Sequence, residues 1–349
     1  MLVVEELRAR VGSFELSDIS LEVPEEGYLV LMGPTGSGKT TLLNVIAGLL
    51  KPTRGRIELD GQDITALPPE ERQIGYVFQD CRLFPHLTVW ENVAFGPRAR
   101  GVRGEELKER VRWALELVGA EELADKRPGE LSGGEAKKTA LARALALMPK
   151  LLLLDEPLAH VDERTRGELL DKLEEVREEL GPIVIHVTHD RLEALKLADQ
   201  LALMDSGRLI QVGDVGSVLS KPVSHFAARF LGYENILRGR CKRAGALFEV
   251  EVGSVKLVTA EGREGDVLAC LRAEDIFLSR EVPRTSARNV LKGRVISLEP
   301  RGTLINVRLE VGPGIELVSV ITPASREELG IEVGASVFLA FKASSVKVI

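Results

Sequence analysis

The amino-acid sequence predicts an α/β domain with a largely parallel sheet over residues 1–232, followed by a small all-β barrel over residues 233–349. The chain of 349 residues is longer than one ordinary domain of ~100–200 residues. Before Tyr233, short apolar segments alternate with helical patterns, which is typical of a parallel sheet covered by helices. After Tyr233, the segments are short, β-rich and separated by Gly turns, as in a small barrel.

The alternating segments give the expected order of the first domain. Strands are expected at Tyr28–Met32, Gly75–Gln79, Leu151–Asp155 and Ile183–Thr188, and helices at Thr41–Leu50, Leu107–Leu117 and Thr165–Leu180.

The second domain contains an internal repeat. The segment Asn235–Arg240 resembles Asn289–Arg294, and Val267–Ala273 resembles Val337–Ala343, in the same order along the chain. Two matches in one order favour a duplication over chance similarity of β-rich segments. We therefore expect an OB-like barrel made of two related halves.

Composition and charge narrow the classes of function. Hydrophobic residues make up 44% and charged residues 28% of the chain, as in folded globular proteins. The net charge of −7 argues against general nucleic-acid binding, which depends on a basic surface. Basic residues outnumber acidic ones from Ile236 onward, which permits an anion site in the barrel without requiring one.

The sequence gives no sign of export or of a membrane span. No apolar run approaches the ~18 residues of a membrane helix, and the first residues lack the basic segment of a signal peptide. The cysteines Cys81, Cys241 and Cys270 have neither CxxC spacing nor neighbouring histidines, so buried thiols are expected rather than disulfides or a zinc site. These features predict residence in the cytoplasm.

A Gly-rich loop follows the expected strand Tyr28–Met32 and precedes an apolar helix. Backbone N–H groups of such a loop surround phosphate oxygens, the lysine neutralises β- and γ-phosphate charge, and the following hydroxyl can bind Mg²⁺. The sequence therefore predicts an ATP site with Mg²⁺ as cofactor. Its expected residues are Gly33, Pro34, Thr35, Gly36, Ser37, Gly38, Lys39, Thr40 and Thr41.

Two adjacent carboxylates, Asp155 and Glu156, end the expected strand Leu151–Asp155. Successive strand residues point in opposite directions, so the two acids can serve different tasks. Asp155 is expected to hold Mg²⁺. Glu156 is expected to act as the general base or to orient the attacking water, because phosphoryl transfer needs an aligned nucleophile and neutralised charge.

A third motif precedes the helical stretch Ala136–Leu147 and consists of Leu131, Ser132, Gly133, Gly134 and Glu135. Together with the two motifs above, it resembles the pattern of ABC ATPases, in which this segment is the signature motif. The resemblance extends over about residues 1–230 and implies further roles. Gln79 resembles the Q-loop residue of the family, Asp162 the D-loop residue, and His189 the switch histidine.

The resemblance implies a mechanism and partners. Glu156, His189 and Gln79 would be catalytic, and Thr40, Gln79 and Asp155 would surround Mg²⁺. The family pairs two subunits head to tail, so the signature loop of one copy closes over the ATP of the other in a homodimer. Two membrane permease subunits would dock near Gln79–Pro97 at the cytoplasmic face of the membrane. An external oxyanion-binding protein would be an indirect partner.

Two positions depart from the family pattern. After Glu135 the family usually has Gln-Gln-Arg, whereas this sequence has Ala136, Lys137 and Lys138, which changes the contact with the nucleotide of the partner subunit. The aromatic residue that stacks on adenine is also missing. Val11 takes its place, and Phe14 is a candidate substitute.

The second domain resembles molybdate-binding domains of the Mop and TOBE type. A tetrahedral dianion requires cations and several hydroxyl or N–H donors. The residues expected to supply them are Ser286, Arg288, Thr322, Ser325, Lys342 and Ser344. The resemblance implies the ATPase subunit of a molybdate or tungstate importer, in which bound oxyanion inhibits transport.

Two alternatives remain open at this stage. The barrel can be purely structural, in the ATPase of a sulfate, ferric-ion, sugar or polyamine importer. A soluble ABC ATPase of repair or translation is less favoured, because a second ATPase half, a coiled-coil insertion and a basic nucleic-acid face are all missing from the sequence.

Overall fold

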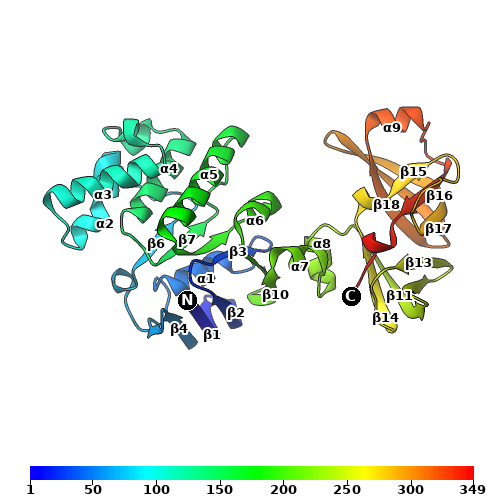
Figure 1. Cartoon of the computed structure of the whole chain (residues 1–349), viewed down its shortest axis with the longest axis horizontal. Helices are drawn as coiled ribbons and strands as arrows, with labels where there is room; N and C mark the ends of the chain where they lie inside the picture. The colour runs from blue at the N-terminus through cyan, green and yellow to red at the C-terminus, as the bar shows by residue number, and fades with distance from the viewer. The chain divides into compact units, whose positions relative to one another are not determined.

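The computed structural model describes all residues, 1–349, as two compact units, Met1–Val218 and Leu219–Ile349 (Figure 1). The boundary expected from composition lies at residues 232/233. In the structure, residues 219–232 belong to the second unit. Tyr233 and Arg272 both donate hydrogen bonds to the carbonyl of Leu219, at 3.4 and 3.1 Å, which fastens this segment to the barrel.

The first unit is built on a six-stranded sheet with the order β10-β9-β3-β8-β7-β6. Strands β3, β6, β7, β8 and β9 are parallel, and β10 is antiparallel to β9. Every residue of β3, β7 and β8 is buried, which explains why these strands read as continuous apolar runs. The strands are β3 (Tyr28–Met32), β6 (Ile74–Val77), β7 (Leu151–Asp155), β8 (Ile183–Val187), β9 (Gln200–Asp205) and β10 (Arg208–Asp214).

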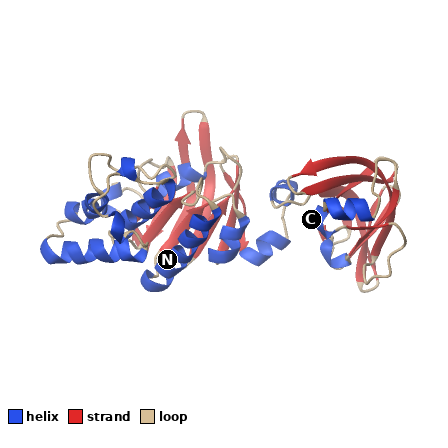
Figure 2. Cartoon of the chain, turned by 90° about the horizontal axis from the view of Figure 1, so that it is seen from above, coloured by secondary structure: helices blue, strands red, loops and turns tan.

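Some helices pack beside this sheet, and others form a separate group at one end of the unit (Figures 1 and 2). Helices α2, α3 and α4 pack against one another at the end of the unit that lies on the left in Figure 1. The helices are α1 (Lys39–Ile46), α2 (Val89–Ala99), α3 (Gly104–Leu117), α4 (Gly133–Leu145), α5 (Glu163–Leu180), α6 (Arg191–Leu197), α7 (Val215–Ser220) and, in the second unit, α8 (His225–Phe230).

A second sheet of four antiparallel strands also belongs to the first unit and was not among the expected elements. Its order is β2-β1-β4-β5, and its inner face shares one apolar core with β3, β8 and α1. The strands are β1 (Leu2–Val11), β2 (Phe14–Val23), β4 (Arg54–Leu59) and β5 (Gln62–Asp63).

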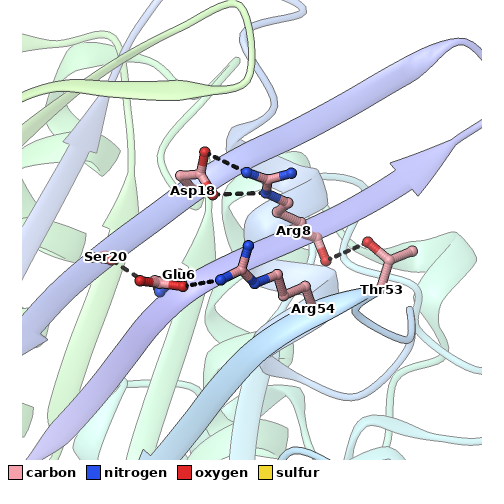
Figure 3. A network of polar contacts seen from close by, with 6 residues as sticks. All are labelled: Glu6, Arg8, Asp18, Ser20, Thr53 and Arg54. Carbon is pink, nitrogen blue, oxygen red and sulfur yellow. Dashed lines mark hydrogen bonds and ion pairs between the residues drawn. The ribbon is translucent and has the colours of Figure 1, made fainter.

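Strand β1 bends through an irregularity at its centre, and polar side chains hold the bend on the exposed face (Figure 3). Glu6 and Asp18 both have left-handed backbone conformations, with φ of 43° and 51°. Arg8 donates two hydrogen bonds to Asp18, at 2.7 and 2.9 Å, and Arg54 donates one to Glu6 at 2.6 Å. These contacts support a backbone geometry that non-glycine residues adopt only at a cost.

A buried arginine closes the carboxyl end of α1. Arg72 is 3% exposed, and its guanidinium donates to the carbonyls of Val45, Ile46, Thr65 and Leu67 at 2.8 to 3.0 Å. The carbonyls of Val45 and Ile46 are among the last of α1, where acceptors lack the usual helical partners, although that of Val45 also accepts from the Gly48 N–H at 3.1 Å. A cation is also favoured at this end of a helix.

We expect Arg72→Met to lower the free energy of unfolding by about 3 kcal/mol, because it leaves several buried carbonyls without donors. Urea denaturation measures this change. The control Arg54→Met removes an exposed ion pair with Glu6 and should change stability by no more than about 0.5 kcal/mol. Equal stabilities of the two variants would contradict the assigned role of Arg72.

The second unit is a barrel of two five-stranded antiparallel sheets, with orders β13-β12-β11-β14-β20 and β15-β19-β16-β17-β18. Their inner faces share one apolar core. The strands are β11 (Asn235–Ala244), β12 (Leu247–Val252), β13 (Val255–Thr259), β14 (Gly265–Leu271), β15 (Phe277–Ser279), β16 (Asn289–Arg301), β17 (Leu304–Gly312), β18 (Ile315–Ile321), β19 (Ser336–Phe341) and β20 (Lys347–Val348), with helix α9 (Pro323–Glu328) between β18 and β19.

The two halves of the barrel repeat the same order of strands and exchange their last strands. Strand β20 of the second half pairs with β14 of the first, and β15 of the first half pairs with β19 of the second. The repeated asparagines likewise bind the backbone of the opposite half. Asn235 binds the N–H and C=O of Val318, and Asn289 those of Val258, each through both ends of its amide at 2.6 and 2.9 Å. The duplication expected from sequence is present.

Candidate nucleotide site

The Gly-rich loop lies between β3 and α1, and its lysine is buried. Lys39 is 8% exposed and donates to the carbonyls of Gly33 and Pro34, at 2.8 and 2.9 Å. A side chain at Gly33 would meet the carbonyl of Met204 on β9 at 2.2 Å, so only glycine fits there. Burial lowers the pKa of the Lys39 ammonium, and the nearby carboxylates of β7 oppose that shift.

The two carboxylates at the end of β7 face different partners. Asp155 is 4% exposed and accepts a hydrogen bond from the Thr40 hydroxyl at 3.1 Å. Glu156 accepts one from the Gln79 amide at 3.1 Å. Burial raises the pKa of the Asp155 carboxyl, which the hydrogen bond from Thr40 opposes. The structure thus joins the Lys39 loop, β7 and the segment after β6 at one edge of the sheet.

His189 follows β8 at the same edge. Strand β8 lies between β3 and β7, so the parallel strands deliver Lys39, Asp155 and His189 to neighbouring carboxyl ends. The His189 residue is exposed. The next residue, Asp190, caps α6 by accepting from the N–H of Leu192, and it pairs with Arg166 of α5 at 3.1 Å.

The signature segment Leu131–Glu135 forms the start of α4. Ser132 and Glu135 cap the helix reciprocally: the Ser132 hydroxyl accepts from the Glu135 N–H, and the Glu135 carboxylate accepts from the Ser132 N–H. The hydrogen bond from the Ser132 N–H is the main cause that lowers the pKa of the Glu135 carboxyl to about 2, and the hydrogen bond from the Lys126 ammonium is the second. A side chain at Gly133 would meet nothing within 4 Å, so the backbone is accessible there.

Asp162 lies beside this segment, at the N-terminus of α5. Its carboxylate accepts hydrogen bonds from the N–H and hydroxyl of Thr165, at 3.0 and 2.6 Å. A side chain at Gly134 would lie 2.6 Å from the methyl group of the same Thr165, so the signature segment packs closely on α5. No hydrogen bond or ion pair joins the signature segment to the Lys39 loop of the same chain.

A connection between α4 and the Gln79–Glu156 pair was not expected from the sequence. Lys137 is 7% exposed, and its ammonium donates to the carbonyls of Gln79 and Glu156 at 2.7 and 3.3 Å. Its spacing from Ala140, Leu141 and Ala144 gives one signal, because a lysine on the apolar face of a helix must be buried with its acceptors.

Comparisons with known proteins give one family match in each of the two units. The profile described as "ABC transporter" matches residues 16–159, and the profile described as "TOBE domain" matches residues 285–348. A protein of Pyrococcus abyssi named "Molybdate/tungstate import ATP-binding protein WtpC" is 44% identical over 348 residues, covering 100% of both chains. The chain belongs to the ABC transporter ATPases. The predicted fold class and the predicted ATP-hydrolysing activity are thereby confirmed.

Other relatives of this ABC ATPase are named for a different cargo. A "Spermidine/putrescine import ATP-binding protein PotA" of Frankia alni is 47% identical over 223 residues, which is 64% of this chain and 48% of that relative. Among solved structures, a dimeric post-hydrolysis state of the ATP-binding cassette MJ0796 bound to ADP and Pi has a TM-score of 0.57 at 31% identity. It covers 62% of this chain and 99% of that one.

The aromatic residue usual in the family is missing from this ABC ATPase, and Val11 and Phe14 pair with each other at the corresponding hairpin. Phe14 is partly buried against the core, and a side chain at Gly38 would lie 2.6 Å from its ring. The ring thus packs against the Lys39 loop. Val11, its pairing partner in the β1–β2 hairpin, is 45% exposed.

The expected oxyanion donors of this ABC ATPase fall into two groups. Asn289 pairs with Phe341 across β16 and β19, so the flanking residues Arg288 and Lys342 lie at the same end of these strands, with Ser286 before them and Ser344 in the following turn. All four residues are exposed.

Thr322 and Ser325 form the second group. The Thr322 hydroxyl caps α9 by accepting from the Ser325 N–H at 3.1 Å and lies 2.9 Å from the Ser325 hydroxyl. The preceding strand is joined to the first half of the barrel by the bond from Ser319 to the Ile276 carbonyl. In Figure 1, α9 lies at the upper edge of the unit and the C-terminal end, which follows Ser344, in its lower half.

Proposed function

We propose that this chain is the ATP-hydrolysing subunit of an importer for molybdate or tungstate. The observation that carries the proposal is the 44% identity to a molybdate/tungstate import protein along the whole chain, including the barrel. Relatives named for polyamine import are less similar: one matches 64% of the chain, and another is 39% identical over 86% of it. The match to the molybdate/tungstate protein combines the higher identity with the longer alignment than this second relative.

The nucleotide site supports Mg²⁺-dependent hydrolysis of ATP. The Thr40 hydroxyl and the Asp155 carboxylate lie 3.1 Å apart, and oxygen donors of this kind suit Mg²⁺, which uses few protein ligands together with phosphates and water. Thr40 and Asp155 would hold the ion, assisted by Gln79. The ion would supply positive charge against the phosphates, and Lys39 would neutralise the β- and γ-phosphate oxygens.

Glu156 would orient the attacking water and accept its proton. Its carboxylate is held by the Gln79 amide at 3.1 Å, which leaves its second oxygen available to the water. His189 follows the adjacent strand and would contact the γ-phosphate from the other side of the site. Catalysis here is chiefly positioning and charge neutralisation, as phosphoryl transfer requires.

The ATPase would work as a homodimer. The open backbone at Gly133 and the N–H groups at the start of α4 suit a phosphate, yet no bond connects them to the Lys39 loop of their own chain. A head-to-tail partner would bring the signature segment over that loop, as the dimeric cassette among the solved structures suggests. Each dimer would then hold two shared ATP sites.

An aromatic groove next to the Gln79 segment would receive a permease at the cytoplasmic face of the membrane. The groove has a volume of about 330 Å³ and is lined by aromatic side chains, with Phe84 and Phe95 rings 4.5 Å apart and Phe95 49% exposed. An exposed apolar groove of this kind fits an amphipathic helix. The structure contains no helix with the length and apolar character of a membrane span.

The oxyanion would bind between the barrels of two copies. One group of donors, with Arg288 and Lys342, supplies both cations, and the other, with Thr322 and Ser325, supplies hydroxyls. Within one chain the two groups are not joined, so a second copy would complete the set. Bound oxyanion would then hold the two barrels in one arrangement and shift the dimer away from its closed, hydrolysing state.

We expect Arg288→Ala and Lys342→Ala each to weaken oxyanion binding about 10- to 100-fold, because each removes a charge-assisted hydrogen bond. Calorimetric titration of the full chain with molybdate, tungstate, sulfate and phosphate measures this. ATP hydrolysis should be unchanged in both variants. The control Arg284→Ala removes an exposed arginine four residues from Arg288 and should bind oxyanion like the wild type.

Transport assays test the regulation itself. In proteoliposomes with the permease, millimolar molybdate or tungstate on the ATP-containing side should inhibit wild-type transport and spare the Arg288→Ala variant. Transport that is indifferent to both oxyanions would leave a structural barrel, as in the alternative importers.

A further inference from the structure

The buried Lys137 connects α4 to two residues of the nucleotide site. It forms no ion pair, and its ammonium instead donates to the carbonyls of Gln79, at 2.7 Å, and Glu156, at 3.3 Å. An unpartnered charge inside a protein is strongly unfavourable, so these carbonyls are the acceptors that permit the burial of Lys137. One side chain thereby fixes two backbone segments to one helix.

The backbone of Glu156 requires such support. Its φ of 47° lies in the left-handed region, which glycine adopts freely and glutamate adopts only when the surroundings impose it. Its N–H donates to the Val187 carbonyl at 3.0 Å, and its carbonyl accepts from Lys137. The residue is thus held from both sides, which determines where its carboxylate points relative to the Gln79 amide.

A second cation of α4 holds the other end of the same loop. Arg143 donates to the carbonyls of Cys81 and Arg82, both at 2.7 Å. Cys81 and Arg82 also have left-handed backbones, with φ of 59° and 45°. The loop from Gln79 to Arg82 is therefore attached to α4 by hydrogen bonds at both of its ends.

We propose that Lys137 is a positioning residue that makes the signature helix, Gln79 and Glu156 move as one body. The signature glycines lie at the N-terminus of α4, so a displacement of that helix reaches the carbonyls of Gln79 and Glu156 through a single ammonium group. Closure of the signature segment on one nucleotide would then align the Gln79–Glu156 pair at the other. This inference rests on the proposed head-to-tail ATPase.

The test uses steady-state ATP hydrolysis and ATP binding by the full chain. We expect Lys137→Met to lower kcat about 10- to 100-fold, the loss typical of a small misplacement of catalytic groups, with the ATP dissociation constant unchanged. Lys137→Gln keeps an N–H donor and should recover most of the activity. The control Lys108→Met removes an exposed lysine of α3, which pairs with Glu105 at 3.0 Å, and should hydrolyse ATP like the wild type.

A double-mutant cycle separates positioning from general destabilisation. If Lys137 acts through Gln79, the losses of Lys137→Met and Gln79→Ala should be less than multiplicative. Wild-type kcat for Lys137→Met, or fully multiplicative losses, would overturn the inference, and the cycle can be repeated with Lys137→Ala, which also removes the donor, if the Met variant fails to fold. These outcomes differ from a failure of the proposed function, because in that case the wild type itself would not hydrolyse ATP.

Discussion

The Glu156→Gln variant should bind ATP and fail to hydrolyse it. The amide keeps the shape of the carboxylate and its contact with Gln79, which lies 3.1 Å away, but it cannot accept the proton of the attacking water. We expect kcat to fall about 10²- to 10⁴-fold, the usual contribution of a general base. In the proposed homodimer, hydrolysis would separate the subunits, so this variant should accumulate as an ATP-bound dimer, which size-exclusion chromatography with ATP detects.

The matched control is Glu163→Gln, an exposed carboxylate in the first turn of α5. It removes the same charge close to the site in sequence and should hydrolyse ATP at the wild-type rate. Near-normal turnover by Glu156→Gln would remove Glu156 from the catalytic role. A variant that neither hydrolyses ATP nor dimerises with it would instead indicate a damaged binding site.

The Lys39→Ala variant should lose affinity for ATP itself. The ammonium group is 8% exposed and is held inside the loop by the carbonyls of Gly33 and Pro34, so it lies where β- and γ-phosphate oxygens would be bound. Loss of one charge-assisted hydrogen bond should raise the dissociation constant for ATP about 10- to 100-fold. Titration with a fluorescent ATP analogue measures this.

Lys51→Ala, an exposed lysine shortly after α1, is the control for Lys39→Ala and should bind ATP like the wild type. A thermal melt of Lys39→Ala identifies any general loss of structure, because its ammonium also holds two loop carbonyls. Unchanged ATP affinity in a folded Lys39→Ala protein would count against the loop as the phosphate site.

Most of the candidate nucleotide site could be predicted from the sequence. The Lys39 loop, the Asp155–Glu156 pair and the signature segment are each contiguous, and each lies where a strand ends or a helix begins. Local backbone geometry therefore decides what these residues can do, and a short motif records it. The barrel repeat was equally readable, because Asn235 and Asn289 perform the same task in each half.

Other features depended on contacts between distant segments. The oxyanion donors were predicted as one set, but the fold places Arg288 and Lys342 with the end of β19 and Thr322 with α9. Lys137 appeared in the sequence as a departure from a family pattern near a nucleotide. Only the packing of α4 against the Gln79 loop showed that its charge is buried and shared by two carbonyls.

The sequence by itself predicted an α/β domain with a largely parallel sheet, a following β-barrel and the candidate nucleotide-binding residues, because these follow from periodicity and from contiguous motifs. The tertiary structure decided the antiparallel sheet of β1, β2, β4 and β5, the exchange of β15 and β20 between the barrel halves, and the role of Arg72. The physical reason is that strand partners and buried charges are chosen by long-range hydrogen bonding and shared burial, which no local segment specifies alone.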